Sequence, residues 1–465
     1  MLTGFTIILA ERGHTSSRTS SPFSRSVEPV STISTMRIQK LDENSRKNLL
    51  EDLLKRSPNN YGQYEQGVTE ILANVKANGD QALFEYTKKF DQADLNAGNI
   101  KVTDAEIEEA YALVDRKLVE IIRKSLANIR TYHEKQRQTS WFDSKPDGTI
   151  LGQKVTALHR VGVYVPGGKA AYPSSVLMNI VPAKVAGVDE IIMVTPPGKD
   201  GKVTPTTLVA AKEAGADAIY KVGGAQAIGA LAYGTESIPK VDKIVGPGNI
   251  YVALAKKAVY GYVSIDAIAG PSEILVIADE TANPRFVAAD LLSQAEHDEL
   301  ASAILVTTSE ELAKKVSDET DKFIKELSQW LTCVLSDENS SGITDFCHDI
   351  KWILCLDFKM LGCNLICCLN CLIHRICNQY VSIVIERFLN NLTTGDYFAG
   401  PNHVLPTNGT AKFFSPLSVD DFIKKSSIIS YSENALRAIH EDIEAFATAE
   451  HLTAHANSIK VRFEK

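Results

Sequence analysis

The sequence predicts an α/β protein built from Rossmann-like domains with parallel sheets, flanked by helical N- and C-terminal parts. Between residues 161 and 276, short apolar runs rich in β-branched residues alternate with segments of helical periodicity. This alternation is typical of parallel strands joined by right-handed crossover helices. Three of the runs end in glycine-rich turns, at residues 166–168, 223–224 and 246–248. Such turns meet at the carboxyl edge of a parallel sheet, where ligands bind.

The composition is that of a globular protein. Hydrophobic residues make up 44% of the 465-residue chain and charged residues 23%, which suits a large folded core. The net charge of −8 argues against nucleic acid as a partner, and no window is apolar enough to predict a membrane span. All eight cysteines lie between Cys333 and Cys377. Because the rest of the chain has none, it suits a reducing compartment, and we expect a cytoplasmic protein.

The first 35 residues have the composition of a targeting or unfolded segment. They are rich in Ser and Thr and contain Arg12, Arg18 and Arg25, as a plastid transit peptide would. The alternative is a non-native or disordered extension, residues 1–35, ahead of a native start at Met36. The sequence MRIQKLDENS favours this second interpretation, and residues 36–58 would then form an N-terminal helical arm.

Residues 59–160 are predicted to be mostly helical, with one strand at their end. Apolar residues at helical spacing predict a helix that ends at Asn78 and Gly79. Asp104 is expected to cap a longer helix. A turn and then a strand at residues 149–160 follow.

The stretch from Gly270 to Asp298 combines a buried strand with a helix. The apolar run at residues 274–278 predicts the strand. Asn283 followed by Pro284 predicts the start of the helix, because Asn caps the first turn and Pro is tolerated at the first helical position. The core side of this helix is expected to hold Phe286, Val287, Leu291, Leu292 and Ala295.

Three polar side chains align on another face of the same helix. Asp290, Gln294 and His297 stand at positions i, i+4 and i+7, so that they lie one above the other. A solvated surface stripe is the simpler interpretation, and a binding site on a rigid element is the alternative.

Polar residues on a later turn-rich segment favour the binding site. Residues 395–407 contain Gly and Pro and are predicted to form a loop that carries Asp396, Asn402 and His403. Loops on a rigid scaffold are frequent places for functional residues.

The C-terminal part is predicted to be helical, at residues 419–425 and 433–456. His451 and His455 stand at i and i+4 in the second segment, which is a spacing that places two imidazoles on one helix face to bind zinc.

Long motifs in this chain resemble those of the histidinol dehydrogenases, the enzymes that end histidine biosynthesis. SQAEHD follows AGPSEILVIAD, and GDYFAGPNHVLPT comes later. The resemblance covers residues 36–318 and 395–465. It implies a homodimeric oxidoreductase that converts L-histidinol to L-histidine by two hydride transfers to NAD at a zinc site.

The resemblance also implies the functional residues and the domains. The family's last zinc ligand reaches the site of the other subunit, and the family has Gly where this chain has His451. NAD contacts fall on Tyr164, Gln226 and Asn249; zinc ligands on Gln294, His297, Asp396 and His455; and substrate contacts on Ser272, Gln294, His297, Asp396, His403, Glu450 and His455. The expected domains are residues 59–160 with 274–415 (a first α/β domain), 161–273 (a second, NAD-binding α/β domain) and 416–465 (a C-terminal helical domain).

One window, residues 329–394, does not resemble the family. It holds every cysteine, and its only histidines, His348 and His374, do not follow a Glu. The family places an adjacent Glu-His acid–base pair ahead of the GDY motif. The catalytic residues are therefore left unassigned.

Three interpretations of this window are open. The first is a cysteine-rich metal insert, although the cysteine spacing fits no zinc template. The second is a membrane segment, although Asp357 and Lys359 interrupt it. The third is a segment read in a different frame. The third is favoured because the spacing between the flanking motifs is kept. The alternative to an active dehydrogenase is therefore a catalytically dead binding protein or a misframed gene product.

Overall fold

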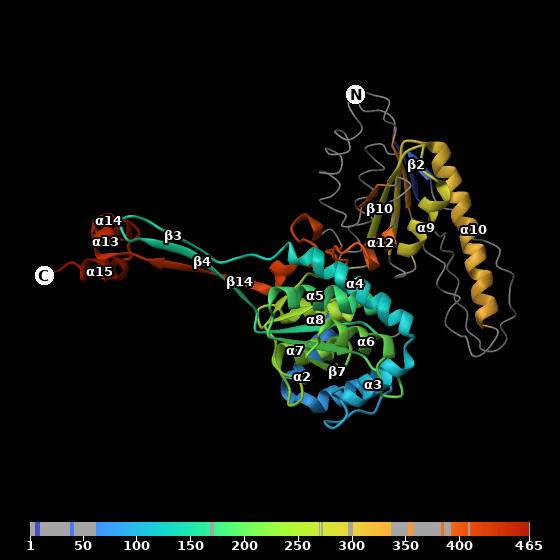
Figure 1. The fold of residues 1–465 in the computed structure, drawn as a ribbon, viewed down its shortest axis with the longest axis horizontal. Helices are drawn as coiled ribbons and strands as arrows, with labels where there is room; N and C mark the ends of the chain where they lie inside the picture. The colour runs from blue at the N-terminus through green and yellow to red at the C-terminus, as the bar shows by residue number, and fades with distance from the viewer. Residues whose placement is uncertain are drawn as a thin grey trace.

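The computed structural model describes residues 5–9, 38–40, 62–167, 172–268, 270, 273–295, 301–335, 352–356, 383–385, 392–407 and 410–464. These residues form a central α/β lobe, a second and smaller α/β lobe, and an arm that extends away from both lobes and ends at the C-terminus (Figure 1). In the described part of the chain, no helix is long and apolar enough to cross a membrane.

The central lobe contains a five-stranded sheet in the order β7-β6-β5-β8-β9, in which all neighbouring strands are parallel. This confirms the α/β fold that the strand–helix alternation predicts. The strands are β5 (Arg160–Tyr164), β6 (Glu190–Thr195), β7 (Ala218–Lys221), β8 (Lys243–Val245) and β9 (Ser264–Ile265). The crossover helices are α5 (Pro173–Ala186), α6 (Pro205–Ala214), α7 (Gly224–Tyr233) and α8 (Ile250–Val259).

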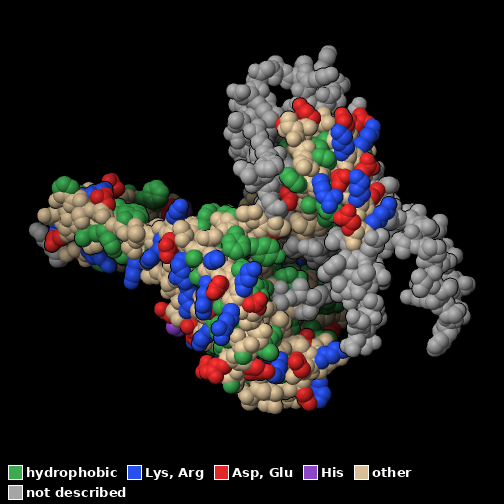
Figure 2. All heavy atoms as spheres, turned by 45° about the vertical axis from the view of Figure 1, so that its right-hand side comes forward, with side chains coloured by type: hydrophobic (Ala, Val, Ile, Leu, Met, Phe, Trp, Pro, Cys, Tyr) green, Lys and Arg blue, Asp and Glu red, His purple; other side chains and the backbone are tan. Residues whose placement is uncertain are grey.

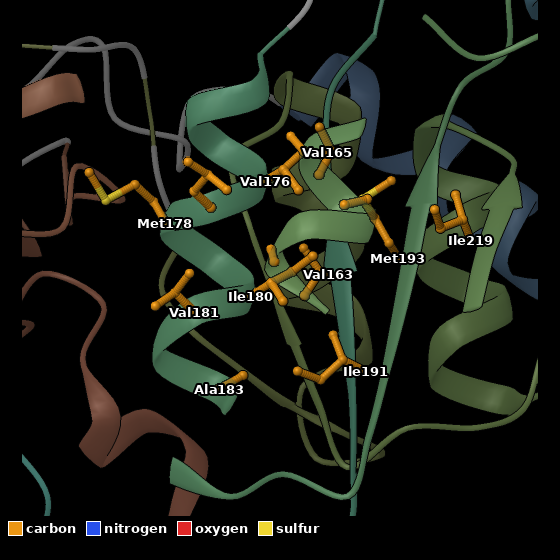
Figure 3. Close-up of a cluster of buried hydrophobic side chains, with 14 of the residues drawn as sticks. Val163, Val165, Val176, Met178, Ile180, Val181, Ala183, Ile191, Met193 and Ile219 are labelled. Carbon is orange, nitrogen blue, oxygen red and sulfur yellow. The ribbon is translucent and has the colours of Figure 1, made fainter. Parts of the chain in front are cut away.

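Alternate strand residues build two separate cores, one on each face of this sheet. Val163, Ile191 and Met193 face α5 and α6 on one side (Figure 3). Their neighbours Ile192 and Val194 pack with α7 and α8 on the other side. Because successive side chains of a strand point to opposite faces, a strand that is apolar throughout is buried on both.

Three helices from the first half of the chain cover the same sheet. These are α2 (Gly62–Phe90), which packs against α7 and α8; α3 (Asp104–Leu113), which packs against α6; and α4 (Arg116–Glu134), which packs against α5. Gly79 interrupts α2 with a left-handed φ of 52°, at the predicted helix end. The cap of α3 is Thr103 rather than Asp104, because the Thr103 side chain accepts from Glu106 N–H in a capping box.

The second lobe is built on a sheet in the order β13-β10-β11-β12-β1-β2. β10 pairs in parallel with β11 and β13, and two helices pack beside it. The strands are β1 (Phe5–Leu9), β2 (Ile38–Lys40), β10 (Glu273–Ala278), β11 (Ser302–Thr307), β12 (Trp352–Leu356) and β13 (Ile383–Ile385), and the helices are α9 (Pro284–Ala295) and α10 (Glu310–Leu335).

Two predictions about segments remain predictions. β1 lies within the expected N-terminal extension, but most of residues 1–35 lie outside the described residues, as do residues 36–37 and 41–58 of the expected arm. The predicted division into one domain of residues 59–160 with 274–415 and another of residues 161–273 likewise remains a prediction. The helices α2 to α4 pack against helices of the central lobe.

The arm combines an antiparallel sheet with three short helices. Its sheet has the order β14-β4-β3. The predicted helix at residues 419–425 is wrong for residues 423–425, because Ile423 starts a strand that pairs with Ala157 of β4. The elements are β3 (Trp141–Ser144), β4 (Ile150–Ala157), β14 (Ile423–Ser430), α13 (Glu433–Arg437), α14 (His440–Ala449) and α15 (Thr453–Lys460).

Candidate active site

The carboxyl edge of the central sheet carries the three residues expected to contact NAD. Tyr164 ends β5, and its hydroxyl accepts a hydrogen bond of 3.2 Å from the backbone N–H of Gly224, where α7 begins. Burial raises the pKa of Tyr164 to about 12. The phenol is therefore neutral at physiological pH and keeps its proton to donate.

Gln226 and Asn249 lie at the starts of the two helices that leave this edge. Gln226 is buried in the first turn of α7. Asn249 caps α8, because its Oδ1 accepts from the backbone N–H groups of Tyr251 at 3.1 Å and Val252 at 3.2 Å. Because β5, β7 and β8 are parallel, their carboxyl ends meet at one edge. The structure thus brings Tyr164, Gln226 and Asn249 to the same edge.

Helix α9 of the second lobe presents buried polar groups rather than a surface stripe. Asn283 Oδ1 accepts from Arg285 N–H at 2.9 Å, which confirms the predicted cap. Asp290 and Gln294 are only 3% and 7% exposed. The prediction that Phe286 belongs to the core side is wrong: it is 41% exposed, because the face with Val287 and Leu291 is the one that packs against the sheet.

A short helix brings Asp396 close to α9. Residues 392–397 form α12 (Leu392–Tyr397), which packs against α9, so the predicted loop is wrong for residues 395–397. His403 Nδ1 lies 3.1 Å from the backbone oxygen of Asp396 and 4.0 Å from its Oδ1. Since the carbonyl can only accept, Nδ1 carries a proton, and in the neutral form of the imidazole Nε2 is then the acceptor nitrogen.

The loop after α12 is fixed by Asn402, which the sequence singles out, and it contacts Ser175, which the sequence does not single out. Asn402 is buried, and its Nδ2 donates to Met178 O at 2.6 Å while its Oδ1 accepts from Val404 N–H at 2.8 Å. Ser175 Oγ lies 3.5 Å from His403 Nε2. Ser175 gives no signal in the sequence, because serine residues in the first turn of a helix are ordinary.

Thr407 ties the far end of this loop to Gly270, three residues before the start of β10. Its hydroxyl accepts from Gly270 N–H and donates to Gly270 O, both at 2.9 Å. Gly270 stands two residues before Ser272, which lies outside the described residues, as does His297. The loop is therefore held both to the central lobe and to the predicted substrate segment.

Glu450 and His455 are not brought to this place within one chain. They lie in the arm, at the end of α14 and in α15, far from α9 and α12, and both are exposed (Figure 1). The interpretation of His451 and His455 as a pair on one helix is wrong. His451 has a left-handed φ of 60° and terminates α14, and α15 begins only at Thr453.

The donor groups that are present suit zinc. Gln294 and Asp396 supply an amide oxygen and a carboxylate from two helices in contact, and oxygen and nitrogen ligands are usual for a zinc site that also takes substrate. Within the described ranges, no group of three or more His, Cys, Asp or Glu is close enough to hold a metal. His297 lies outside those ranges, and His455 lies in the arm.

A parallel sheet with glycine-rich turns at its carboxyl edge is the architecture of an α/β protein that binds its ligand at that edge, as many enzymes do. The chain belongs to the histidinol dehydrogenase family, whose model matches residues 54–463. Its members are oxidoreductases of histidine biosynthesis that use NAD and Zn²⁺, and these are the cofactors of this chain. The family suggested by the motifs is confirmed.

Individual relatives agree with this assignment. The chain is 51% identical over 419 residues to histidinol dehydrogenase of Halalkalibacterium halodurans, a match that covers 86% of this chain and 94% of that protein. It is 53% identical over 401 residues to histidinol dehydrogenase of Bacillus subtilis, covering 85% and 92%. The crystal structure of histidinol dehydrogenase from Elizabethkingia anophelis is similar with a TM-score of 0.73 at 35% identity, covering 86% and 92%. These matches give no support to a dead or misframed product.

Proposed function

We propose that the chain oxidises L-histidinol to L-histidine as a homodimer, in which residues of both subunits form each active site. The observation that carries the dimer is the separation of the predicted ligands. Gln294 and Asp396 lie on contacting helices, whereas His455 is exposed at the end of the arm. A second copy of the chain would supply the missing imidazole, since a symmetric dimer exchanges its arms reciprocally.

The surface of the arm supports this arrangement. Trp141 and Phe142 on β3 are 52% and 58% exposed, and Ile429 on β14 and Phe446 on α14 are each 70% exposed. Hydrophobic side chains are visible on the arm in Figure 2. Exposed apolar groups gathered on one part of a molecule are typical of a surface that is covered by a partner. A second subunit is the partner that also completes the zinc site.

The proposed roles are those that the family resemblance implies, divided here between two subunits. Gln294, His297 and Asp396 of one subunit and the partner's His455 would hold zinc, while Ser272, His403 and the partner's Glu450 would contact histidinol. When bound, zinc would orient and polarise the amine and imidazole of the substrate. His403 would offer its unprotonated Nε2 as an acceptor, because its Nδ1 is engaged by Asp396 O. Tyr164, Gln226 and Asn249 would bind NAD. The cysteine-free body of the chain suits the cytoplasm.

Metal analysis of Asp396→Ala tests the zinc site. The purified variant should lose nearly all of its zinc, because the site loses its only charged oxygen ligand and cannot hold the ion against dilution. Asp94→Ala, which removes an exposed carboxylate from the central lobe, should keep the zinc of the unmodified protein. If Asp396→Ala retained as much zinc as Asp94→Ala, the proposed ligand set would be wrong.

A further inference from the structure

A buried ion pair lies beneath one of the three glycine-rich turns. Lys256, near the end of α8, pairs with Asp266, which follows β9; their side chains are 3% and 7% exposed. No residue expected to contact NAD or substrate belongs to this pair. A buried ion pair is costly because both charges leave water, so its presence calls for a function that an apolar pair could not serve.

The ion pair forms hydrogen bonds with both the backbone carbonyl and the backbone N–H of Gly246. Lys256 Nζ donates to Gly246 O at 3.0 Å, and Gly246 N–H donates to Asp266 Oδ2 at 2.8 Å. The strand pairing of β8 ends at Val245, so Gly246 is buried directly beyond the sheet. Without the ion pair, these two buried groups would lose the hydrogen-bond partners that offset the free energy of their desolvation. Asp266 Oδ1 also accepts from Ala267 N–H at 2.7 Å.

The turn itself can adopt its shape only with glycine at this position. Gly246 has a φ of 118°, and a Cβ on it would lie 2.1 Å from the backbone oxygen of Tyr164. The turn is thus pressed against the end of β5, where Tyr164 lies. It leads within three residues to Asn249, the cap of α8. Any shift of Gly246 would therefore move two of the residues expected to contact NAD.

We propose that Lys256 and Asp266 are positioning residues for the cofactor: they hold the turn at residues 246–249 in the conformation that receives NAD. This inference rests on the proposed NAD site at the sheet edge. Asn249 caps the start of α8, and Lys256 lies near the other end of this helix, from where its ammonium group donates to Gly246 O. The pair does not touch the cofactor and acts through the backbone.

Calorimetric titration of the zinc-loaded protein with NAD, without histidinol, tests the proposal. Lys256→Met removes the donor and keeps the length of the side chain. Lys257→Met is the matched control, because Lys257 lies next to it on the same helix but is exposed and, among the described residues, pairs with Glu65 alone across 3.2 Å. The Kd for NAD should rise about tenfold or more in Lys256→Met and stay within about twofold in Lys257→Met.

A second variant and two further readouts separate positioning from folding. Asp266→Asn keeps the shape of the side chain and one acceptor but removes the charge that holds Lys256, so its Kd for NAD should also rise. If Lys256→Met does not fold, the Kd of Asp266→Asn tests the proposal in its place. Zinc content and the KM for histidinol at saturating NAD should be unchanged, which a general loss of structure would not allow. Folded Lys256→Met and Asp266→Asn that bind NAD as tightly as Lys257→Met would overturn the inference. Failure of the unmodified protein to bind NAD would instead overturn the proposed NAD site, and the inference with it.

Discussion

His451 occupies a backbone conformation that suits glycine. Its φ of 60° lies in the left-handed region, where a Cβ costs about 1 kcal/mol or more. The family has Gly here, and the turn between α14 and α15 supplies the physical reason. We expect His451→Gly to raise the free energy of unfolding by about 1 kcal/mol, measured by urea denaturation. Leu452→Gly is the control: Leu452 has an ordinary φ of −91°, and its replacement should lower stability. Equal losses in both variants would contradict this account.

Asp91 should make the protein less stable as the pH rises. Burial raises its pKa to about 6, and its Oδ2 has no hydrogen-bond partner among the described residues. The folded state therefore binds this proton more tightly than the unfolded state, so stability falls between about pH 4 and pH 6 and stays lower above.

Replacing Asp91 by Asn removes that loss. At pH 7.5, Asp91→Asn should be more stable by about 1–2 kcal/mol, after discounting for the partial exposure of the carboxyl, and the gain should disappear below about pH 4. Thermal unfolding across this pH range measures it. Asp94→Asn is the control, since Asp94 is exposed and pairs loosely with Lys88. A gain that does not change with pH would argue against the buried carboxyl as its cause.

At the scale of elements, the sequence predicts those strands and helix ends that depend on residues close together in the chain. The apolar runs of β5, β6 and β10 and the cap at Asn283 are recognisable because their signals lie within a few residues. The wrong assignment at residues 423–425 has a tertiary cause: Ile423 pairs with Ala157, far away in the sequence. Phe286 is exposed for a similar reason, because only the packing of α9 on its sheet selects the buried face.

The segment at residues 329–394 contributes β12 and β13 to the second sheet but lacks a Glu-His pair. Exchanging it for the corresponding segment of the Bacillus subtilis relative should raise the rate of NADH formation from L-histidinol by about 10²–10⁴-fold, the usual contribution of a general acid–base group. Zinc content of both proteins is the control for folding of the site. Equal rates would show that another group of this chain already performs the proton transfers.

At the scale of the whole molecule, the site could be predicted only in part. Motifs predict Asp396 and His455 as ligands, but no residue pattern by itself shows that one chain holds them apart. That separation comes from the arm, whose strands β4 and β14 carry the C-terminal helices away from α12 (Figure 1). The proposed site shared between subunits, which the family resemblance implies, is supported by this shape of the fold, and no short motif encodes that shape.

Complementation between two inactive variants tests the shared site most directly. Asp396→Ala and His455→Ala are each expected to lack activity. The two proteins are unfolded together in equal amounts, refolded with zinc and assayed for NADH formation from L-histidinol. Half of the dimers should be mixed, and each mixed dimer has one site with both ligands intact, so about a quarter of the rate of the identically refolded unmodified protein should return. A mixture no more active than the separately refolded variants would contradict the account, because each subunit would then have to supply both ligands to its own site.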